Sequence, residues 1–153
     1  MRVFALLGFI LTASACSTTY VVPPDPTPVI GVQLIGRQGE CVDVQDGGTA
    51  DGAPIVVVHC HGSPNQRWFV QNGVISENYG SCIDVQGAAP NDGAALVLVT
   101  CSGTSSQQWS IVAGQIIGLG KKCLTETGGI TADQTPLILF SCAADAGQLW
   151  TVR

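Results

Sequence analysis

Charge is scarce in this sequence. Only 11% of its 153 residues are charged, and eleven acidic against six basic residues leave a net charge of −5 at pH 7. Phosphate binding requires several clustered cations. Here the basic residues are scattered apart from one pair: Arg2, Arg37, Arg67, Lys121, Lys122 and Arg153. The composition therefore predicts no nucleic-acid partner.

Catalytic and metal-binding motifs are also missing. No nucleophile elbow is present, and the two histidines, His59 and His61, lie side by side in one segment. On a strand they would share a face, but a metal site needs further ligands, and the cysteines do not form Cys-x-x-Cys pairs. We expect no catalytic residue, no metal site and no cofactor.

A long hydrophobic run is absent as well. A helix that spans a membrane needs about 20 apolar residues, and the apolar run near the amino terminus covers only residues 3–11. This run follows Arg2 and precedes small residues, which is the order of an export signal. We therefore expect residues 1–15 to be a signal peptide.

Cys16, directly after this segment, allows two interpretations. Residues 13–15, Ala-Ser-Ala, form a site for ordinary signal peptidase, which would release a secreted protein. The same segment resembles a bacterial lipobox, whose cysteine is acylated, although Ala13 stands where that motif more often has leucine. Seven is an odd count, so one cysteine of an exported chain must be a free thiol, part of an intermolecular bridge or a modified residue. We expect Cys16 to be lipidated and to anchor the protein in a bilayer.

Residues 17–30 are rich in proline and small residues, with prolines at 23, 24, 26 and 28. Such spacing favours a stiff extended tether, which at about 3.1 Å per residue would be roughly 40 Å long. Ser17 follows Cys16, where an aspartate would resemble an inner-membrane retention signal. The expected location is thus the bacterial cell envelope, at the outer membrane if the organism is Gram-negative.

The remainder of the chain is an internal repeat. "CVDVQ", "CIDVQ" and "CLTET" begin at positions 41, 82 and 123, and "QRW", "QQW" and "QLW" begin at 66, 107 and 148, always with an offset of 41 residues. The rows are therefore residues 31–71, 72–112 and 113–153. A constant period of this size indicates a repeat architecture.

Each row has the pattern of short strands. "APIVVVHC", "AALVLVTC" and "TPLILFSC" are apolar runs bounded by turn residues, and three shorter runs flank each of them. Four strands in each of three rows fit an all-β β-trefoil with pseudo-threefold symmetry better than a propeller, which typically has four or more blades. Trp68, Trp109 and Trp150 recur at one point of the row, where we expect them in the core.

Six cysteines, all except Cys16, follow the same period. The second cysteine of each row lies 19 residues after the first, which favours the bridges Cys41–Cys60, Cys82–Cys101 and Cys123–Cys142. Spacing alone leaves the other pairings open, since six cysteines allow fifteen. A bridge closing such a loop would stabilise the fold by about 3 kcal/mol.

Together, these residues resemble the ricin-type β-trefoil lectins and related carbohydrate-binding modules. The resemblance covers residues 31–153 and rests on the three QxW motifs, the cysteine pairs and the Asp two residues after the first cysteine. It implies a shallow sugar site in each row. Such a site would contain that Asp, an aromatic platform two residues before the second cysteine, a polar residue two positions before the platform, and an Asn before the QxW glutamine. Some bacterial members add a His directly after the second cysteine.

No row carries the complete set that the resemblance implies. The first row has the polar part, Asp43, His61, Asn65 and Gln66, but Val56 and Val58 replace the polar residue and the platform. The weaker second row retains Asp84, with Val97, Val99, Ser102 and Ser106 elsewhere. The third has the ring of Phe140, but Thr125 and Gly147 replace the Asp and the Asn.

We therefore predict a non-catalytic, lectin-like envelope lipoprotein whose best site lies in the first row. Its partner would be a galactoside or xylan-like glycan bound with millimolar affinity, about −4 kcal/mol. The alternative is an envelope module that has lost sugar binding and meets a protein partner. In that case Val56, Val58, Val97 and Val99 would form an exposed apolar patch.

Overall fold

The computed structural model describes residues 31–78, 80–129 and 132–153. The predicted signal peptide, Cys16 and the tether lie outside the described residues. No helix in the described part is long and apolar enough to cross a membrane. This part contains twelve strands: β1 (Leu34–Gly36), β2 (Glu40–Val44), β3 (Ala53–His59), β4 (Phe69–Gln71), β5 (Val74–Glu77), β6 (Ser81–Val85), β7 (Ala94–Thr100), β8 (Ser110–Val112), β9 (Gln115–Ile117), β10 (Cys123–Glu126), β11 (Thr135–Phe140) and β12 (Trp150–Val152).

Short 3-10 helices connect many of these strands. Those in the described residues are η1 (Gln45–Gly47), η2 (Pro64–Gln66), η3 (Gln86–Ala88), η4 (Ser105–Gln107), η5 (Leu119–Lys121), η6 (Thr127–Gly129) and η7 (Ala146–Gln148). Tight turns at Asn72–Gly73 and Ala113–Gly114 join β4 to β5 and β8 to β9, and all four residues have positive φ. Positive φ at both central residues is the geometry of the two-residue turns that suit hairpins.

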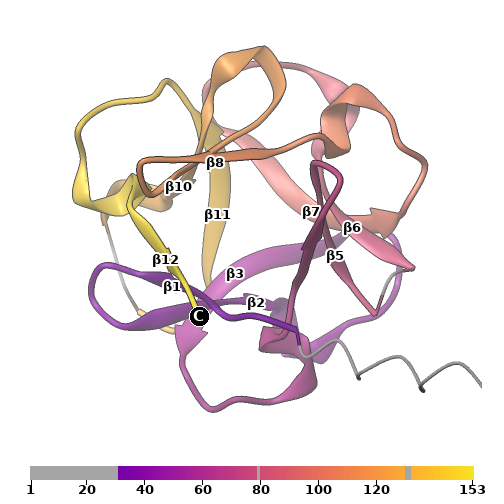
Figure 1. Cartoon of the computed structure of the whole chain (residues 1–153), viewed down its shortest axis with the longest axis vertical. Helices are drawn as coiled ribbons and strands as arrows, with labels where there is room; N and C mark the ends of the chain where they lie inside the picture. The colour runs from indigo at the N-terminus through magenta and orange to yellow at the C-terminus, as the bar shows by residue number, and fades with distance from the viewer. Residues whose placement is uncertain (1–30, 79, 130–131) are drawn as a thin grey trace, which may run out of the picture.

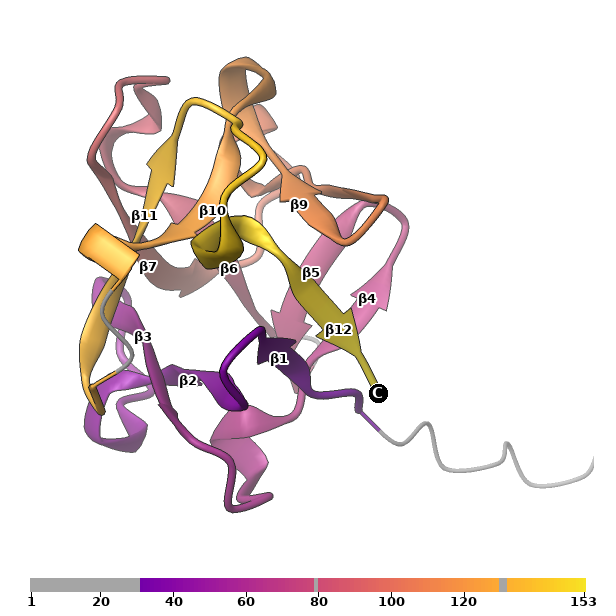
Figure 2. The same cartoon turned by 90° about the vertical axis from the view of Figure 1, so that its left-hand side faces the viewer.

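The strands pair across the rows as well as within them. Antiparallel hairpins β2–β3, β6–β7 and β10–β11 come from one row each, and β3, β7 and β11 also pair with one another. β1 pairs with β12, which brings the two ends of the domain side by side (Figures 1 and 2). A propeller keeps its strands within separate blades, so the expected β-trefoil of twelve short strands is confirmed.

One core fills the centre of the three rows. Equivalent positions supply it, for example Leu34, Ile75 and Ile116 from the strands that follow each row's start. The three tryptophans are at most 5% exposed. Their indole Nε1 atoms donate to the carbonyls of Val42, Ile83 and Leu124 at 2.9, 2.9 and 3.2 Å. The prediction that they belong to the core is therefore confirmed.

The disulfides join cysteines within rows, as the period favoured: Cys41–Cys60, Cys82–Cys101 and Cys123–Cys142. The first cysteine of each bridge lies in or beside a buried strand. Each bridge therefore ties the outer end of one hairpin to the core.

The exposed valine patch of the alternative hypothesis is not formed. Val56, Val58 and Val97 are only 0, 7 and 5% exposed, and Val99 is half-buried. Val56 and Val58 lie in β3, opposite Asp43 and Cys41 of β2, and β11 pairs with β3 on its other side at Val56. Because these side chains are buried or half-buried, they offer a protein partner little apolar surface.

A recurrent aspartate links each row to another, a feature that the sequence analysis missed. Asp51, Asp92 and Asp133, spaced by 41 residues, accept hydrogen bonds from the backbone N–H of the residue before a second cysteine. The donors are Thr100, Ser141 and His59, at 2.7, 2.8 and 2.7 Å. Each bond crosses to a different row, so the three carboxylates hold the hairpins together.

Asp92 also forms an ion pair with Lys122. Its Oδ1 lies 2.5 Å from Lys122 Nζ, and it accepts from the Ser141 hydroxyl at 3.0 Å. The bond from Lys122, followed by those from Ser141, lowers the pKa of Asp92 against the opposing effect of desolvation. A lowered folded-state pKa stabilises the fold above the ordinary aspartate pKa, and this contribution is lost as pH falls through the folded value.

Asp92→Asn should lower the melting temperature at pH 7, because the amide is a weaker acceptor for Lys122 and Ser141. The gap to the wild type should narrow below about pH 4, where the native carboxylate also becomes protonated. Thermal unfolding followed by circular dichroism at several pH values would measure both effects. Asp46→Asn is the control, since Asp46 makes no hydrogen bond through its side chain in the described residues; an equal loss there would contradict this assignment.

Candidate functional site

One buried glutamine organises the site region of every row. In the first row Gln66 Oε1 accepts from the backbone of His61 and Gly62 at 2.9 and 3.1 Å, and Nε2 donates to Asp43 at 2.8 Å. Gln107 makes the matching bonds to Ser102, Gly103 and Asp84. The glutamines are at most 2% exposed. From the interior of the domain, they therefore fix the positions of the site residues by hydrogen bonds.

The first row brings together all four predicted residues. Asn65 Nδ2 and Gln66 Nε2 donate to the two carboxylate oxygens of Asp43, and His61 Nε2 lies 3.6 Å from Asp43 Oδ2. Asp43 is only 2% exposed, whereas the His61 side chain is 34% exposed. The carboxylate is thus enclosed by its own row. Burial, followed by the charge of Asp43, raises the pKa of the neighbouring Glu77.

In the second row, Asp84 borders a shallow cavity of about 370 Å³. Val97, Val99 and Ser106 line this cavity, together with Gly52 from the first row. Asp84 is 9% exposed and accepts from Gln107 at 2.8 Å. The walls carry no aromatic side chain, so a sugar ring would find no flat apolar platform here.

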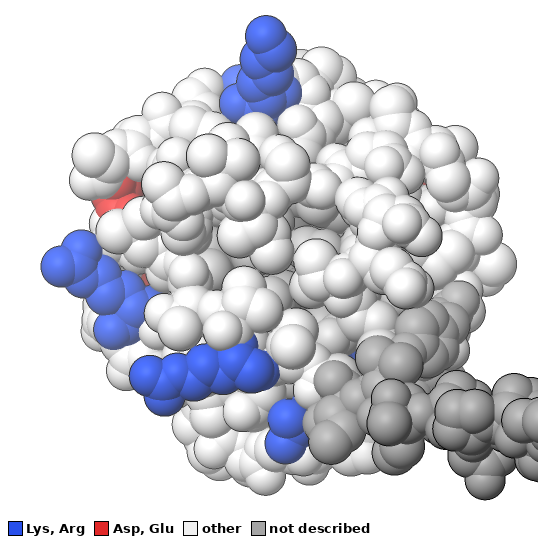
Figure 3. Space-filling model, in the orientation of Figure 1, with Lys and Arg blue, Asp and Glu red and all other residues white. Residues whose placement is uncertain are grey.

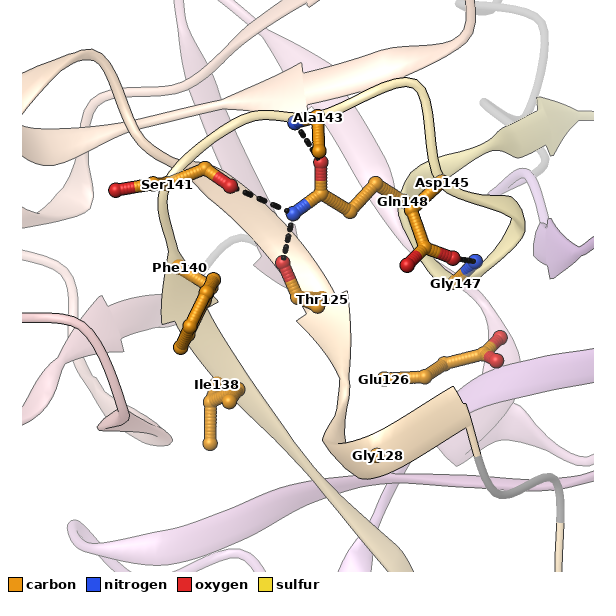
Figure 4. Close-up of a pocket in the computed structure, with 10 residues that line it drawn as sticks. All are labelled: Thr125, Glu126, Gly128, Ile138, Phe140, Ser141, Ala143, Asp145, Gly147 and Gln148. Atoms are coloured by element: carbon orange, nitrogen blue, oxygen red, sulfur yellow. Dashed lines mark hydrogen bonds between the residues drawn. The ribbon is translucent and has the colours of Figure 1, made fainter.

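The third row holds a cavity of about 250 Å³, whose lining residues are drawn in Figure 4. The Phe140 ring and Ile138 form one wall, and Asp145 and Gly147 form the other. Thr125 and Gln148 lie between the walls, joined by a 3.0 Å bond from Gln148 Nε2 to Thr125 Oγ1. Phe140 is 43% exposed, which makes its face available to a ligand.

Asp145 is a site residue that the sequence analysis missed. The motif places a carboxylate two residues after the first cysteine, where this row has Thr125. Asp145 instead enters from the loop before η7, where its Oδ1 accepts from Gly147 N at 2.9 Å. The signal in the sequence was a lone aspartate where the other rows have Ser63 and Thr104.

The two histidines have separate partners. His59 Nδ1 lies 2.7 Å from Asp133 Oδ2, and His61 Nδ1 lies 2.8 Å from Ser63 Oγ, while the rings meet edge to face at 5.4 Å. The bond from His59 is the main cause that lowers the pKa of Asp133. Among residues 31–78, 80–129 and 132–153, no group of three or more potential metal ligands is found.

Charge is thinly spread on the face drawn in Figure 3. The visible Lys and Arg side chains stand apart from one another on a mostly uncharged surface, and little acidic surface is seen. Lys122 is moreover paired with Asp92 at 2.5 Å. On this face of the described domain, the cations do not join into one basic patch.

Comparison with known proteins identifies the family. The model of the ricin-type beta-trefoil lectin domain matches residues 30–109, more than half of the chain. No curated protein sequence matches this chain. Among solved structures, the designed threefold-symmetric protein ThreeFoil is 25% identical with a TM-score of 0.71, over 79% of this chain and 96% of that one.

Two natural structures are similar at the same level. An exo-beta-1,3-galactanase from Clostridium thermocellum is 25% identical with a TM-score of 0.72, over 81% of this chain and 30% of that one. A non-toxic homologue of type II RIPs from Momordica charantia, in complex with alpha-methyl-D-galactoside, is 25% identical with a TM-score of 0.69, over 80% and 48%. The chain thus spans less than half of either protein. Its fold, repeats and family match agree: this chain belongs to the ricin-type beta-trefoil lectin domain family.

Proposed function

We propose that this domain binds a galactose-containing glycan through the pocket of its third row, without catalysing a reaction on it. The observation that carries the proposal is the exposed ring of Phe140 facing Asp145 across the cavity (Figure 4). The family membership supports sugar binding in general. Two similar proteins suggest the galactoside class. The Momordica charantia homologue was solved with alpha-methyl-D-galactoside, and the Clostridium thermocellum enzyme is named as a galactanase.

The two walls suit the two surfaces of a sugar. A pyranose has a patch of C–H bonds that packs on an aromatic face, and hydroxyls in fixed directions that need polar partners. Phe140 supplies the face, and Asp145 has a second oxygen, Oδ2, to accept from hydroxyls beside the Oδ1 that Gly147 N holds. Because Asp145 lines the pocket and no lysine or arginine does, anionic sugars should be disfavoured.

The first row, favoured from the sequence, is the less suitable site in this proposal. Asp43 is 2% exposed and its two oxygens already accept from Asn65 and Gln66. Val58, in place of the platform, is 7% exposed. His61 remains accessible, so the first row could add weak contacts but lacks a surface on which a sugar ring would stack.

Phe140→Ala should weaken glycan binding about tenfold, since it removes the stacking surface. From a millimolar starting affinity, that loss would bring binding near the detection limit even for a domain displayed multivalently. A glycan array with galactosides, xylans and cell-wall glycans would measure it, with Asp145→Asn as a second variant. Neither side chain belongs to the core, so thermal melting should change little in either.

Val112→Ala is the matched control, because Val112 is 56% exposed and lies outside the pocket. Asp43→Ala distinguishes a first-row site from a third-row site. If Asp43→Ala lost glycan binding while Phe140→Ala kept it, and both proteins were folded, the site would lie in the first row. If the wild type bound no glycan in any class, the sugar-binding proposal would fail and a protein partner would become the better hypothesis.

We also propose that Cys16 carries the lipid anchor of an envelope lipoprotein. The three disulfides use six of the seven cysteines, which leaves Cys16 as the one without a partner in these bridges. A left-over cysteine in an exported chain is a free thiol, part of an intermolecular bridge or a modified residue, and the resemblance of residues 13–16 to a lipobox favours acylation. Anchoring at the outer membrane would hold many copies together, so that weak sites could act jointly on a polymeric glycan.

Cys16→Ser should abolish acylation. In a Gram-negative host, the wild-type chain should incorporate a labelled fatty acid and enter the detergent phase on Triton X-114 partition, and the variant should do neither. Cys82→Ser with Cys101→Ser is the control that removes two cysteines and keeps Cys16. Equal labelling of Cys16→Ser and the wild type would refute the anchor and favour plain secretion.

A further inference from the structure

Two buried glutamates from different rows meet beside β1. Glu40 begins β2 and Glu126 ends β10, and they are 5 and 4% exposed. Both approach Gly36: a Cβ added there would overlap Glu40 Oε1 and lie 2.5 Å from Glu126 Oε1. Glycine at position 36 therefore leaves the space in which the two carboxyl groups come together.

This pair interrupts the threefold pattern. The positions equivalent to Glu126 are Val44 and Val85, which belong to the core and are 1% exposed. The positions equivalent to Glu40 are Ser81 and Lys122. A carboxyl group thus replaces an apolar core residue only where the third row meets the first, and there it finds a second carboxyl group.

Both carboxyl groups have an unsatisfied oxygen. Among the described residues, Glu40 Oε1 and Glu126 Oε1 are buried without a hydrogen-bond partner. Two adjacent carboxylates repel each other at low dielectric, and neither can donate a hydrogen bond. One proton held between them removes one charge and creates a donor, so a single O–H···O⁻ bond satisfies both oxygens.

The groups packed around the pair add negative rather than positive charge. Asp145 contributes a further negative charge near Glu126. Leu137 of β11 is opposite Glu126, while η6 carries no titratable side chain. His59 is opposite Glu40 in β3 but is exposed and paired with Asp133, and Arg37, next to Gly36, is exposed. No described cation is therefore available to neutralise the pair.

We propose that Glu40 and Glu126 form a proton-binding site that fastens the third row to the first. When the proton is present, the two rows are joined by a buried carboxyl–carboxylate hydrogen bond. When it is lost, two like charges face each other in the core and weaken the junction. Burial, then hydrogen bonding with Glu40, then the charges of Glu40 and Asp145, raise the pKa of Glu126 to about 8. The proton should therefore be held at neutral pH and lost in mildly alkaline solution.

The sign of the pH effect follows from this proton. Between about pH 4.5, the ordinary value for glutamate, and about 8, the native pair binds a proton that the unfolded chain has released. Its contribution to stability is therefore complete below about pH 4.5 and declines as pH rises to about 8. The limit for one proton is about a tenfold increase in the unfolding constant per pH unit.

Glu126→Gln tests the site, because its amide donates permanently to the Glu40 carboxylate without titrating. Urea unfolding between pH 5 and 9 should show the wild type losing stability relative to this variant as pH rises. Glu126→Val, which places the side chain of the other two rows at this position, is a second variant without the proton. Asp46→Asn should keep the wild-type profile. Identical pH profiles for the wild type and both Glu126 variants would overturn the proposal.

Infrared difference spectra provide a direct reading. At pH 7 the wild type should absorb as a protonated carboxylic acid, and Glu126→Gln should lack this band; absence of the band from the wild type would overturn the proposal. Stabilisation of the wild type, but not of Glu126→Gln, by added Ca²⁺ would show a cation site and overturn it as well. Glu126 also lines the third-row pocket, but these measurements use no sugar, so a failure here is distinguishable from a failure of the proposed function.

Discussion

The buried glutamine of each QxW motif is the interaction on which the site region depends. Gln66, with its counterparts in the other rows, joins the loop after the second cysteine to the strand that contains the first. Its amide meets a carboxylate in two rows and the Thr125 hydroxyl in the third. Since these hydrogen bonds use groups inside the fold, they are retained whether or not the outer surface binds a ligand.

Because these internal contacts do not depend on the outer surface, the three rows can share one set of structural contacts and still differ as binding sites. These shared contacts need the glutamine, the tryptophan, the disulfide and the apolar strands, and every row has them. The outer positions differ in side chain and in exposure from row to row. In the first row this position is Val58, which is buried, whereas in the third row it is Phe140, which is 43% exposed beside the cavity. Divergence at the surface therefore has little effect on the core.

The junctions between rows show the same contrast between repetition and exception. Asp51, Asp92 and Asp133 make one repeated bond from row to row. The Glu40–Glu126 contact occurs only where the third row meets the first, the junction that also brings β12 beside β1. One junction of this repeat domain thus differs from the other two by its pair of carboxyl groups. Since this junction joins the last row to the first, its protonation affects the stability of the whole domain.

Much of the fold could be predicted from the sequence because its signals are local and repeated. The strand alternation, the tryptophan positions and the cysteine spacing each depend on neighbours within one row, and all of them recur every 41 residues. The family motifs then predicted which side chains would surround Asp43, and the structure does bring Asn65, Gln66 and His61 to it.

Only the tertiary structure decided which site is open and what meets between rows. Val56 is fully buried and lies opposite Pro136 of β11, which comes from the third row. Asp145 enters its pocket from a loop outside the motif, and Glu40 meets Glu126 from the far end of the chain. Exposure and contact depend on how three rows close around one axis. The sequence alone determined the row, and packing between rows determined the surfaces that a ligand or a proton can reach.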